Sequence, residues 1–196
     1  MNRRAAPKAN TAAHSAKGNS VSAHHPTPAS ALTLPQKLFA HTQEHPQRLA
    51  QRVKRKGVWH CYTWSDVFER TRSMALGAAA QGLRRGETVI VIGENEPEHY
   101  WALFAAQSLG AKTVSVYPDA TVDELHYLCE DSKARFIFAQ DQEQVDKALS
   151  LLERLPDIRG IAYWDNSGMW SYRHPLLQSF DALTAEGRRQ HDRHPQ

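Results

Sequence analysis

The chain has 196 residues, of which 41% are hydrophobic and 23% charged, with ten glycines, ten prolines and two cysteines. A chain of this length usually forms about one domain, and this composition excludes collagen-like, wholly disordered and disulfide-stapled proteins. Cys61 and Cys129 form no CxxC motif, and no apolar run approaches the roughly 18 residues that a membrane span needs. We therefore expect a cytoplasmic protein without a transmembrane segment, with peripheral membrane contact left open.

The net charge of +3 comes from the N-terminal segment. Residues 1–33 hold four Lys and Arg residues and no acid, which leaves 20 basic and 21 acidic residues in the rest. A nucleic-acid-binding protein concentrates positive charge on its folded part, so we expect no nucleic-acid partner. Residues 1–33 also contain only Val21 and Leu32 as large aliphatic residues, which predicts a disordered tail. The absence of acids would also suit a transit peptide, but arginine is sparse and no amphipathic stripe is present.

Regular secondary structure is predicted from Leu34 onward. Proline disfavours helix at the residue before it, so a first helix should end ahead of Pro46. A Gly near the turn of two β-like runs indicates a hairpin, and Ser or Thr before an amphipathic run indicates a helix start. These signals predict a helix over residues 36–44, a hairpin with strands at 49–53 and 58–62, and a helix capped by Thr63 or Ser65 that reaches about residue 81.

Four β-like runs then alternate with three helical patterns. The runs begin near Val89, Thr113, Phe136 and Ile158. The intervening helices are marked by Pro97 in a first turn, by a Thr121–Glu124 capping box, and by apolar residues at helical spacing from Val145. This alternation predicts an α/β fold with a mostly parallel sheet flanked by helices. Beyond it we expect a turn at 165–168, an extended loop at 170–175, a closing helix over 176–187, and a truncated linker over 189–196.

The segment from His41 to His45 matches the HxxEH zinc signature literally. Two histidines at i and i+4 could bind zinc, with Glu44 as general base. However, Pro46 ends the helix at once, no third ligand is identifiable, and 11 histidines make this spacing common by chance. A surface helix end is the preferred interpretation, and no metal site is predicted.

No nucleotide motif is present in the sequence. There is neither GxGxxG nor GxxxxGK[ST], and the first strand–helix junction, 93–97, carries two carboxylates that would repel phosphate. Asn95 there is interpreted as a helix N-cap, with a ligand contact as the alternative.

Cys129 lies on an apolar helix face and is predicted to be an inert core thiol. The five tryptophans are interpreted as packing residues, because no basic residues interleave with them as base stacking requires: Trp59, Trp64, Trp101, Trp164 and Trp170.

The order of several sequence blocks resembles the start of an AMP-forming acyl-CoA synthetase, of the adenylate-forming superfamily. The matching blocks are Tyr62–Val67, Gly82–Val89, Glu94–Tyr100, Leu109–Ala111, Val116–Pro118 and Leu128–Arg135. Glu87 and His99 replace the usual Asp and Trp, at positions that look structural. Three later blocks resemble the long-chain fatty acyl branch: Gln142–Lys147, Leu155–Arg159 and Tyr172–Gly187.

The resemblance covers about residues 34–188 and implies the N-terminal part of the large domain of such a ligase. The family joins a fatty acid to CoA through an acyl-adenylate, using ATP, Mg²⁺ and CoA. Its phosphate loop and its catalytic lysine do not occur before Gln196. No catalytic, cofactor-binding or metal-binding residue is therefore predicted for this chain, which is expected to be inactive and cofactor-free when isolated. An incomplete parallel sheet also predicts self-association.

Two other functions are considered. The chain could be a non-catalytic interaction module derived from such an enzyme. It could also be an unrelated flavodoxin-like nucleotide-binding protein, which the acidic first strand–helix loop disfavours.

Overall fold

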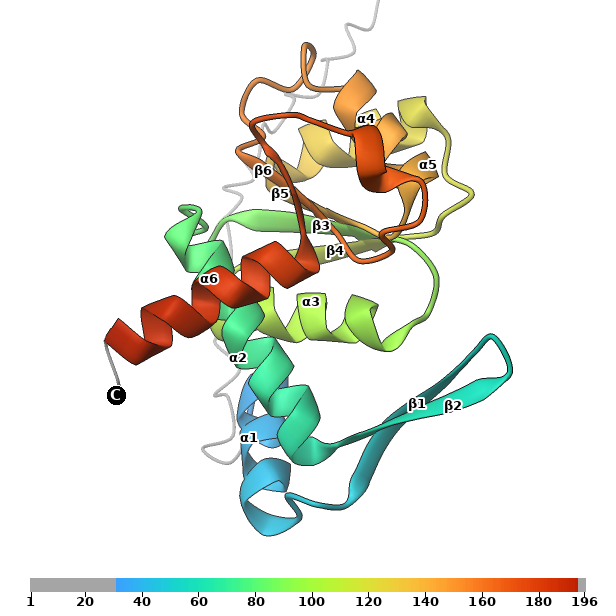
Figure 1. The fold of residues 1–196 in the computed structure, drawn as a ribbon. Helices are drawn as coiled ribbons and strands as arrows, with labels where there is room; N and C mark the ends of the chain where they lie inside the picture. Colours follow the sequence, from blue (N-terminus) through green and yellow to red (C-terminus); the bar gives the residue numbers. More distant parts are fainter. Residues whose placement is uncertain (1–30, 194–196) are drawn as a thin grey trace, which may run out of the picture. The chain divides into compact units, whose positions relative to one another are not determined.

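The computed structural model describes residues 31–193, so most of the predicted tail lies outside the described residues. Predicted elements reappear in order, as Figure 1 shows. The helices are α1 (Leu34–Glu44), α2 (Trp64–Ala80), α3 (Pro97–Ser108), α4 (Val122–Ser132), α5 (Gln142–Ser150), the 3-10 helix η1 (Met169–Ser171) and α6 (Phe180–Arg193). The strands are β1 (Leu49–Arg55), β2 (Val58–Thr63), β3 (Thr88–Ile92), β4 (Lys112–Val116), β5 (Ala134–Ala139), β6 (Gly160–Tyr163) and β7 (Leu177–Ser179).

Capping boxes start three of the helices. In α2 the hydroxyl of Thr63 accepts the backbone N–H of Asp66, and the Asp66 carboxylate accepts the N–H of Thr63 in return. Thr121 and Glu124 do the same for α4, as predicted. Such boxes satisfy N–H groups that have no partner within the helix, which fixes where each helix begins.

The β1–β2 hairpin is antiparallel and turns at Lys56 and Gly57. Both residues have positive φ, 49° and 82°, as a two-residue turn of this twist requires. The other strands form a parallel sheet in the order β4-β3-β5-β6-β7. The predicted α/β class, with a parallel sheet and an N-terminal hairpin, is confirmed.

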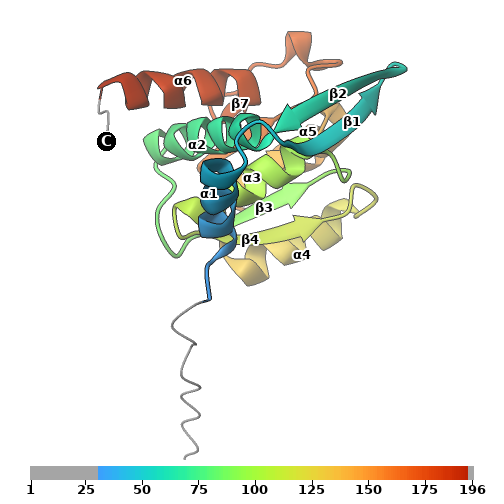
Figure 2. The same ribbon diagram turned by 90° about the horizontal axis from the view of Figure 1, so that it is seen from below.

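Helices cover both faces of this sheet. Along β3, Val89 and Val91 face a core shared with α2, α3 and α6, whereas Ile90 and Ile92 face a core shared with α4 and α5. Figure 2 shows α3 and α4 on opposite sides of β3 and β4. A strand buried on both faces has no polar side, which explains the uninterrupted apolar run in the sequence.

The C-terminal elements differ from the prediction. Residues 177–179 form strand β7, and the closing helix begins only at Phe180. That helix continues to Arg193, so five of the residues expected to form a linker are helical. The predicted extended loop contains η1. A strand of three residues is too short to show any periodicity, so it could not be separated from the helix that follows.

Two glycines bring α2 and α6 together. A Cβ on Gly187 would lie 1.8 Å from the Ser73 carbonyl oxygen, and a Cβ on Gly77 would lie 2.1 Å from the Leu183 carbonyl oxygen. The two backbones therefore approach more closely than any side chain would permit.

Strands β4 and β7 are the edges of the five-stranded sheet. Unpaired edges can pair with another chain, so self-association stays a prediction. Within residues 31–193, no helix combines the length and the apolar character that crossing a membrane would take.

Candidate functional site

Open parallel sheets usually bind ligands beyond the carboxyl ends of their strands, where neighbouring strands continue to opposite faces. Here β3 continues into α3 on one face, and its neighbour β5 continues into α5 on the other. The other neighbour, β4, continues into α4 on the same face as α5, so the topology allows a ligand crevice between the ends of β3 and β5 or between the ends of β3 and β4.

Side chains fill the crevice between β3 and β5. A Cβ on Gly93 would lie 2.6 Å from Cβ of Gln140 and 2.7 Å from the Trp164 ring. The next backbone N–H, that of Glu94, donates to the Gln140 side-chain oxygen at 2.6 Å. A glycine-rich loop normally offers such N–H groups to phosphate, but here a glutamine accepts one of them. The loop after β3 therefore packs against Gln140 and Trp164 at this point.

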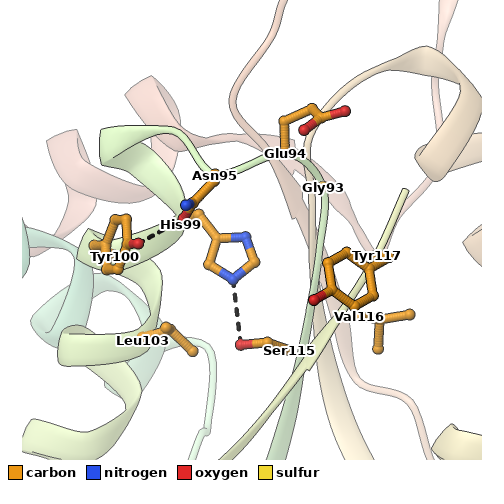
Figure 3. Close-up of a pocket in the computed structure, with 9 residues that line it drawn as sticks. All are labelled: Gly93, Glu94, Asn95, His99, Tyr100, Leu103, Ser115, Val116 and Tyr117. Carbon is orange, nitrogen blue, oxygen red and sulfur yellow. Dashed lines mark hydrogen bonds between the residues drawn. The ribbon is translucent and has the colours of Figure 1, made fainter. Parts of the chain in front are cut away.

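The open space lies on the other side of β3, between the ends of β3 and β4 and the first turns of α3. It is a cavity of about 340 Å³ (Figure 3). Its walls combine a few polar side chains with apolar ones: Gly93, Glu94, Asn95, His99, Tyr100, Leu103, Ser115, Val116 and Tyr117. We take this cavity as the candidate site.

His99 forms the inner wall of the cavity. Its Nε2 lies 3.2 Å from the hydroxyl oxygen of Ser115, and the ring is only 8% exposed. Burial lowers the pKa of His99, so the imidazole is neutral at pH 7. Nδ1 is buried and has no hydrogen-bond partner among the residues that the structure describes. The neutral imidazole and the Ser115 hydroxyl therefore form a hydrogen-bonding pair on the cavity wall.

Asn95 lines the same cavity and does not cap α3. The N-cap is Glu96, which makes no side-chain capping bond, and the Asn95 side-chain oxygen accepts the Tyr100 hydroxyl at 2.5 Å. The N-cap prediction is wrong because Pro97 forces the residue before it into extended conformation, which moves the helix start by one residue. The alternative, a ligand contact by Asn95, stays a prediction.

The two carboxylates of the 93–97 junction, Glu94 and Glu96, were expected to repel phosphate, but the structure separates them from each other and neutralises part of the acidic charge here, including that of Glu98 in α3. Only Glu94 lines the cavity. Glu98 makes a bidentate pair with Arg55, with distances of 3.1 and 2.6 Å. Glu96 lies 3.4 Å from the same guanidinium and accepts the indole N–H of Trp164 at 3.0 Å. Arg55 therefore neutralises part of the negative charge and fixes the hairpin to the start of α3.

The HxxEH segment is a helix end. Helix α1 stops at Glu44, and His45 is its C-cap. The His41 ring stacks on Trp64 with a centroid distance of 4.7 Å. Within residues 31–193, no three metal-ligating side chains of the His, Cys, Asp or Glu type come together.

The tryptophans divide into two groups. Trp101 is buried and donates to Gln51 at 2.8 Å, and Trp64 and Trp164 are half-buried, so the packing interpretation holds for these three. Trp59 and Trp170 are 54% and 82% exposed. The expectation that no basic residues interleave with the tryptophans does not hold at Trp59, where strand pairing places cations against the ring, nor at Trp101, where Arg70 lies over the ring.

The predicted core thiol Cys129 is buried, and burial raises its pKa to about 12. At about pH 8 such a thiol holds roughly one thiolate in ten thousand. We expect Ellman's reagent to label the exposed Cys61 rapidly and Cys129 only after unfolding. Cys61→Ser should abolish the fast reaction and Cys129→Ala should leave it intact. Rapid labelling of two thiols in the native protein would contradict the burial of Cys129.

The parallel sheet with helices on both faces and the cavity beside β3 define an α/β protein, and comparison with known proteins gives its family. Residues 38–180 match the model of the family described as AMP-binding enzyme. The chain belongs to this family.

Curated relatives agree with this assignment. The long-chain-fatty-acid–CoA ligase FadD15 of Mycobacterium bovis is 26% identical over 133 residues, which is 67% of this chain and 22% of the relative. The long-chain-fatty-acid–CoA ligase ACSBG1 of Bos taurus is 24% identical over 115 residues, 59% of this chain and 16% of the relative. The chain thus spans less than a quarter of the length of these relatives.

Solved structures show the same fold. Acetoacetyl-CoA synthetase from Streptomyces lividans has a TM-score of 0.69 at 20% identity, over 77% of this chain and 24% of that one. The A domain of carboxylic acid reductase from Segniliparus rugosus has a TM-score of 0.66 at 19% identity, over 80% and 30% respectively. The resemblance to an adenylate-forming acyl-CoA ligase is confirmed at the level of family and fold.

Proposed function

We propose that this chain is the N-terminal portion of an ATP-dependent fatty acid–CoA ligase. In the whole enzyme a fatty acid carboxylate would react with ATP to give acyl-adenylate and pyrophosphate, and CoA would then take the acyl group as a thioester. The observation that carries this proposal is the family match over residues 38–180 together with relatives named long-chain-fatty-acid–CoA ligases. Mg²⁺ belongs to the same proposal as the partner of ATP.

The 196-residue chain by itself is proposed to form no acyl-adenylate. Stabilising the charge that develops during adenylation requires positioned donors, a metal ion or a cation. In this chain the crevice between β3 and β5 is occupied by Gln140 and Trp164, and the open cavity carries the exposed carboxylate of Glu94. These residues support a scaffolding role, in which catalytic groups come from elsewhere in a longer protein.

A reducing cytoplasmic location is part of this proposal. Cys61 is an exposed free thiol and Cys129 a buried one. Proteins of oxidising compartments usually pair their cysteines, so free thiols of this kind favour a reducing environment.

The test is ATP–pyrophosphate exchange with palmitate. We expect the 196-residue chain to give no exchange above a blank without enzyme, because its sequence contains no phosphate-loop motif. A longer chain that continues through a phosphate loop should give exchange that depends on palmitate. Exchange by the short chain would show that these residues contain a nucleotide site. Failure of the longer, folded chain would instead favour a non-catalytic interaction module.

A further inference from the structure

The two faces of the β1–β2 hairpin have different surroundings. One face packs on α3, where Gln51 accepts the indole N–H of Trp101 and Arg55 pairs with Glu98. Tyr62, on the same face, meets the Trp101 ring edge-on at a centroid distance of 5.0 Å. Side chains alternate along a strand, so the residues between these point away from α3.

The outer face of the hairpin is cationic and aromatic. The strand register places Lys54 opposite Trp59 and Arg52 opposite Cys61, so these four residues share the face. The Arg52 guanidinium lies 4.7 Å from the centre of the Trp59 ring, and the Lys54 ammonium lies 5.9 Å from it. All four residues are exposed. We call Arg52, Lys54 and Trp59 the hairpin face.

Within residues 31–193, no acidic side chain forms an ion pair with Arg52 or Lys54. Residues 49–63 contain no acid. The outer face of the hairpin therefore presents two cations without an ion-pair partner, Arg52 and Lys54, beside the exposed indole of Trp59.

We propose that the hairpin face docks on the surface of an anionic lipid membrane. Tryptophan favours the boundary between headgroups and acyl chains, where its ring is buried and its N–H stays hydrated. Lys and Arg are attracted by the negative surface potential of anionic lipids, and their long stems let the charge reach the headgroups while the ring inserts. The cations that stack on Trp59 are therefore placed where anionic headgroups would surround the ring. This inference does not depend on the proposed ligase function.

Two other occupants fit the charges less well. A symmetric dimer through this face would bring the same cations of both copies together, and like charges in direct contact repel. Single-stranded nucleic acid needs a basic groove with several stacking aromatics. Here one exposed tryptophan lies on the hairpin, and residues 34–196 carry one acid more than bases.

The test is sedimentation of the 196-residue chain with lipid vesicles. Vesicles of phosphatidylcholine with about 30% phosphatidylglycerol should bind the chain at least about tenfold more tightly than pure phosphatidylcholine, and salt should weaken this binding. The double variant Arg52→Gln/Lys54→Gln and the single variant Trp59→Ala should each lose most of it. These side chains are exposed, and circular dichroism would verify that the variants fold.

Matched controls come from the same chain. Lys37→Gln/Lys112→Gln removes two exposed cations elsewhere, and Trp170→Ala removes an exposed indole elsewhere. Both should bind anionic vesicles like the unmodified chain. The proposal is overturned if vesicle binding is absent, equal for neutral and anionic vesicles, or reduced as much by the controls. It is also overturned if the hairpin variants instead abolish a dimer or the binding of a single-stranded oligonucleotide. Vesicle binding by the longer chain of the exchange assay must also depend on Trp59. If Trp59→Ala had no effect on vesicle binding in that chain, other residues would cover the hairpin face and the proposal would be overturned.

Discussion

Replacing Phe138 by alanine should lower the free energy of unfolding by about 3–5 kcal/mol, the largest effect expected of any single substitution here. Phe138 lies in the central strand β5, is 1% exposed, and meets the Phe180 ring edge-on at 5.5 Å. Removing the ring leaves a cavity between the sheet and α6 that the surrounding backbone cannot close. Urea unfolding followed by circular dichroism measures the loss. The expected loss is a large fraction of the free energy of unfolding of a typical domain, which is about 5–15 kcal/mol.

The control for this substitution is Tyr127→Ala on α4. Tyr127 is 64% exposed, so its removal should change the free energy of unfolding by no more than about 0.5 kcal/mol. Equal losses for Phe138→Ala and Tyr127→Ala would show that the α6 side of the sheet is not packed as described.

The second large effect is a loss of stability on replacing a helical glycine by alanine, where helix propensity alone predicts a gain. Alanine is favoured over glycine in a helix by about 1 kcal/mol, yet Gly187→Ala in α6 should destabilise the protein by about 1–3 kcal/mol. The added Cβ would lie 1.8 Å from the Ser73 carbonyl oxygen and 2.8 Å from the Gly77 nitrogen, both backbone atoms of α2. Relief requires α6 to move away from α2. The same urea unfolding experiment applies.

Arg188→Ala is the matched control, since Arg188 is the exposed neighbour of Gly187 on the same helix. It should be neutral within about 0.5 kcal/mol. If Gly187→Ala raised the stability, helix propensity would outweigh packing, and α2 and α6 could not approach as closely as their glycines allow.

The sequence predicted those elements whose signals are local. A capping box involves residues three positions apart, so Thr63 and Thr121 mark the starts of α2 and α4 without reference to the rest of the fold. The apolar run of β3 likewise predicts a buried central strand. Strand β7 was missed because it has three residues and exists only through its pairing with β6.

The candidate site depends on distant residues, which is why most of it was missed. Arg55 and Glu98 are 43 positions apart, so the neutralisation of that glutamate could not be seen from the loop alone. Trp164 reaches the end of β3 from a later part of the chain. The cations around Trp59 come from the partner strand, and the hairpin register that brings them there was not used in the prediction. His99 was noted as a departure from the family pattern, but its place in a cavity wall needed the fold.

During synthesis of the protein, the contact between α2 and α6 can form only some time after α2 has been made. Gly77 and Gly187 touch across the helix pair but are 110 positions apart in the chain. At a translation rate of 5–20 residues per second, roughly 5–20 s pass between their synthesis. During this time the side of α2 that α6 will cover has no partner, while the hairpin, α3 and the first parallel strands can already assemble around the other side. We expect the nascent chain to be most vulnerable to aggregation in that interval, and helix α6, the last described element to be made, to end it.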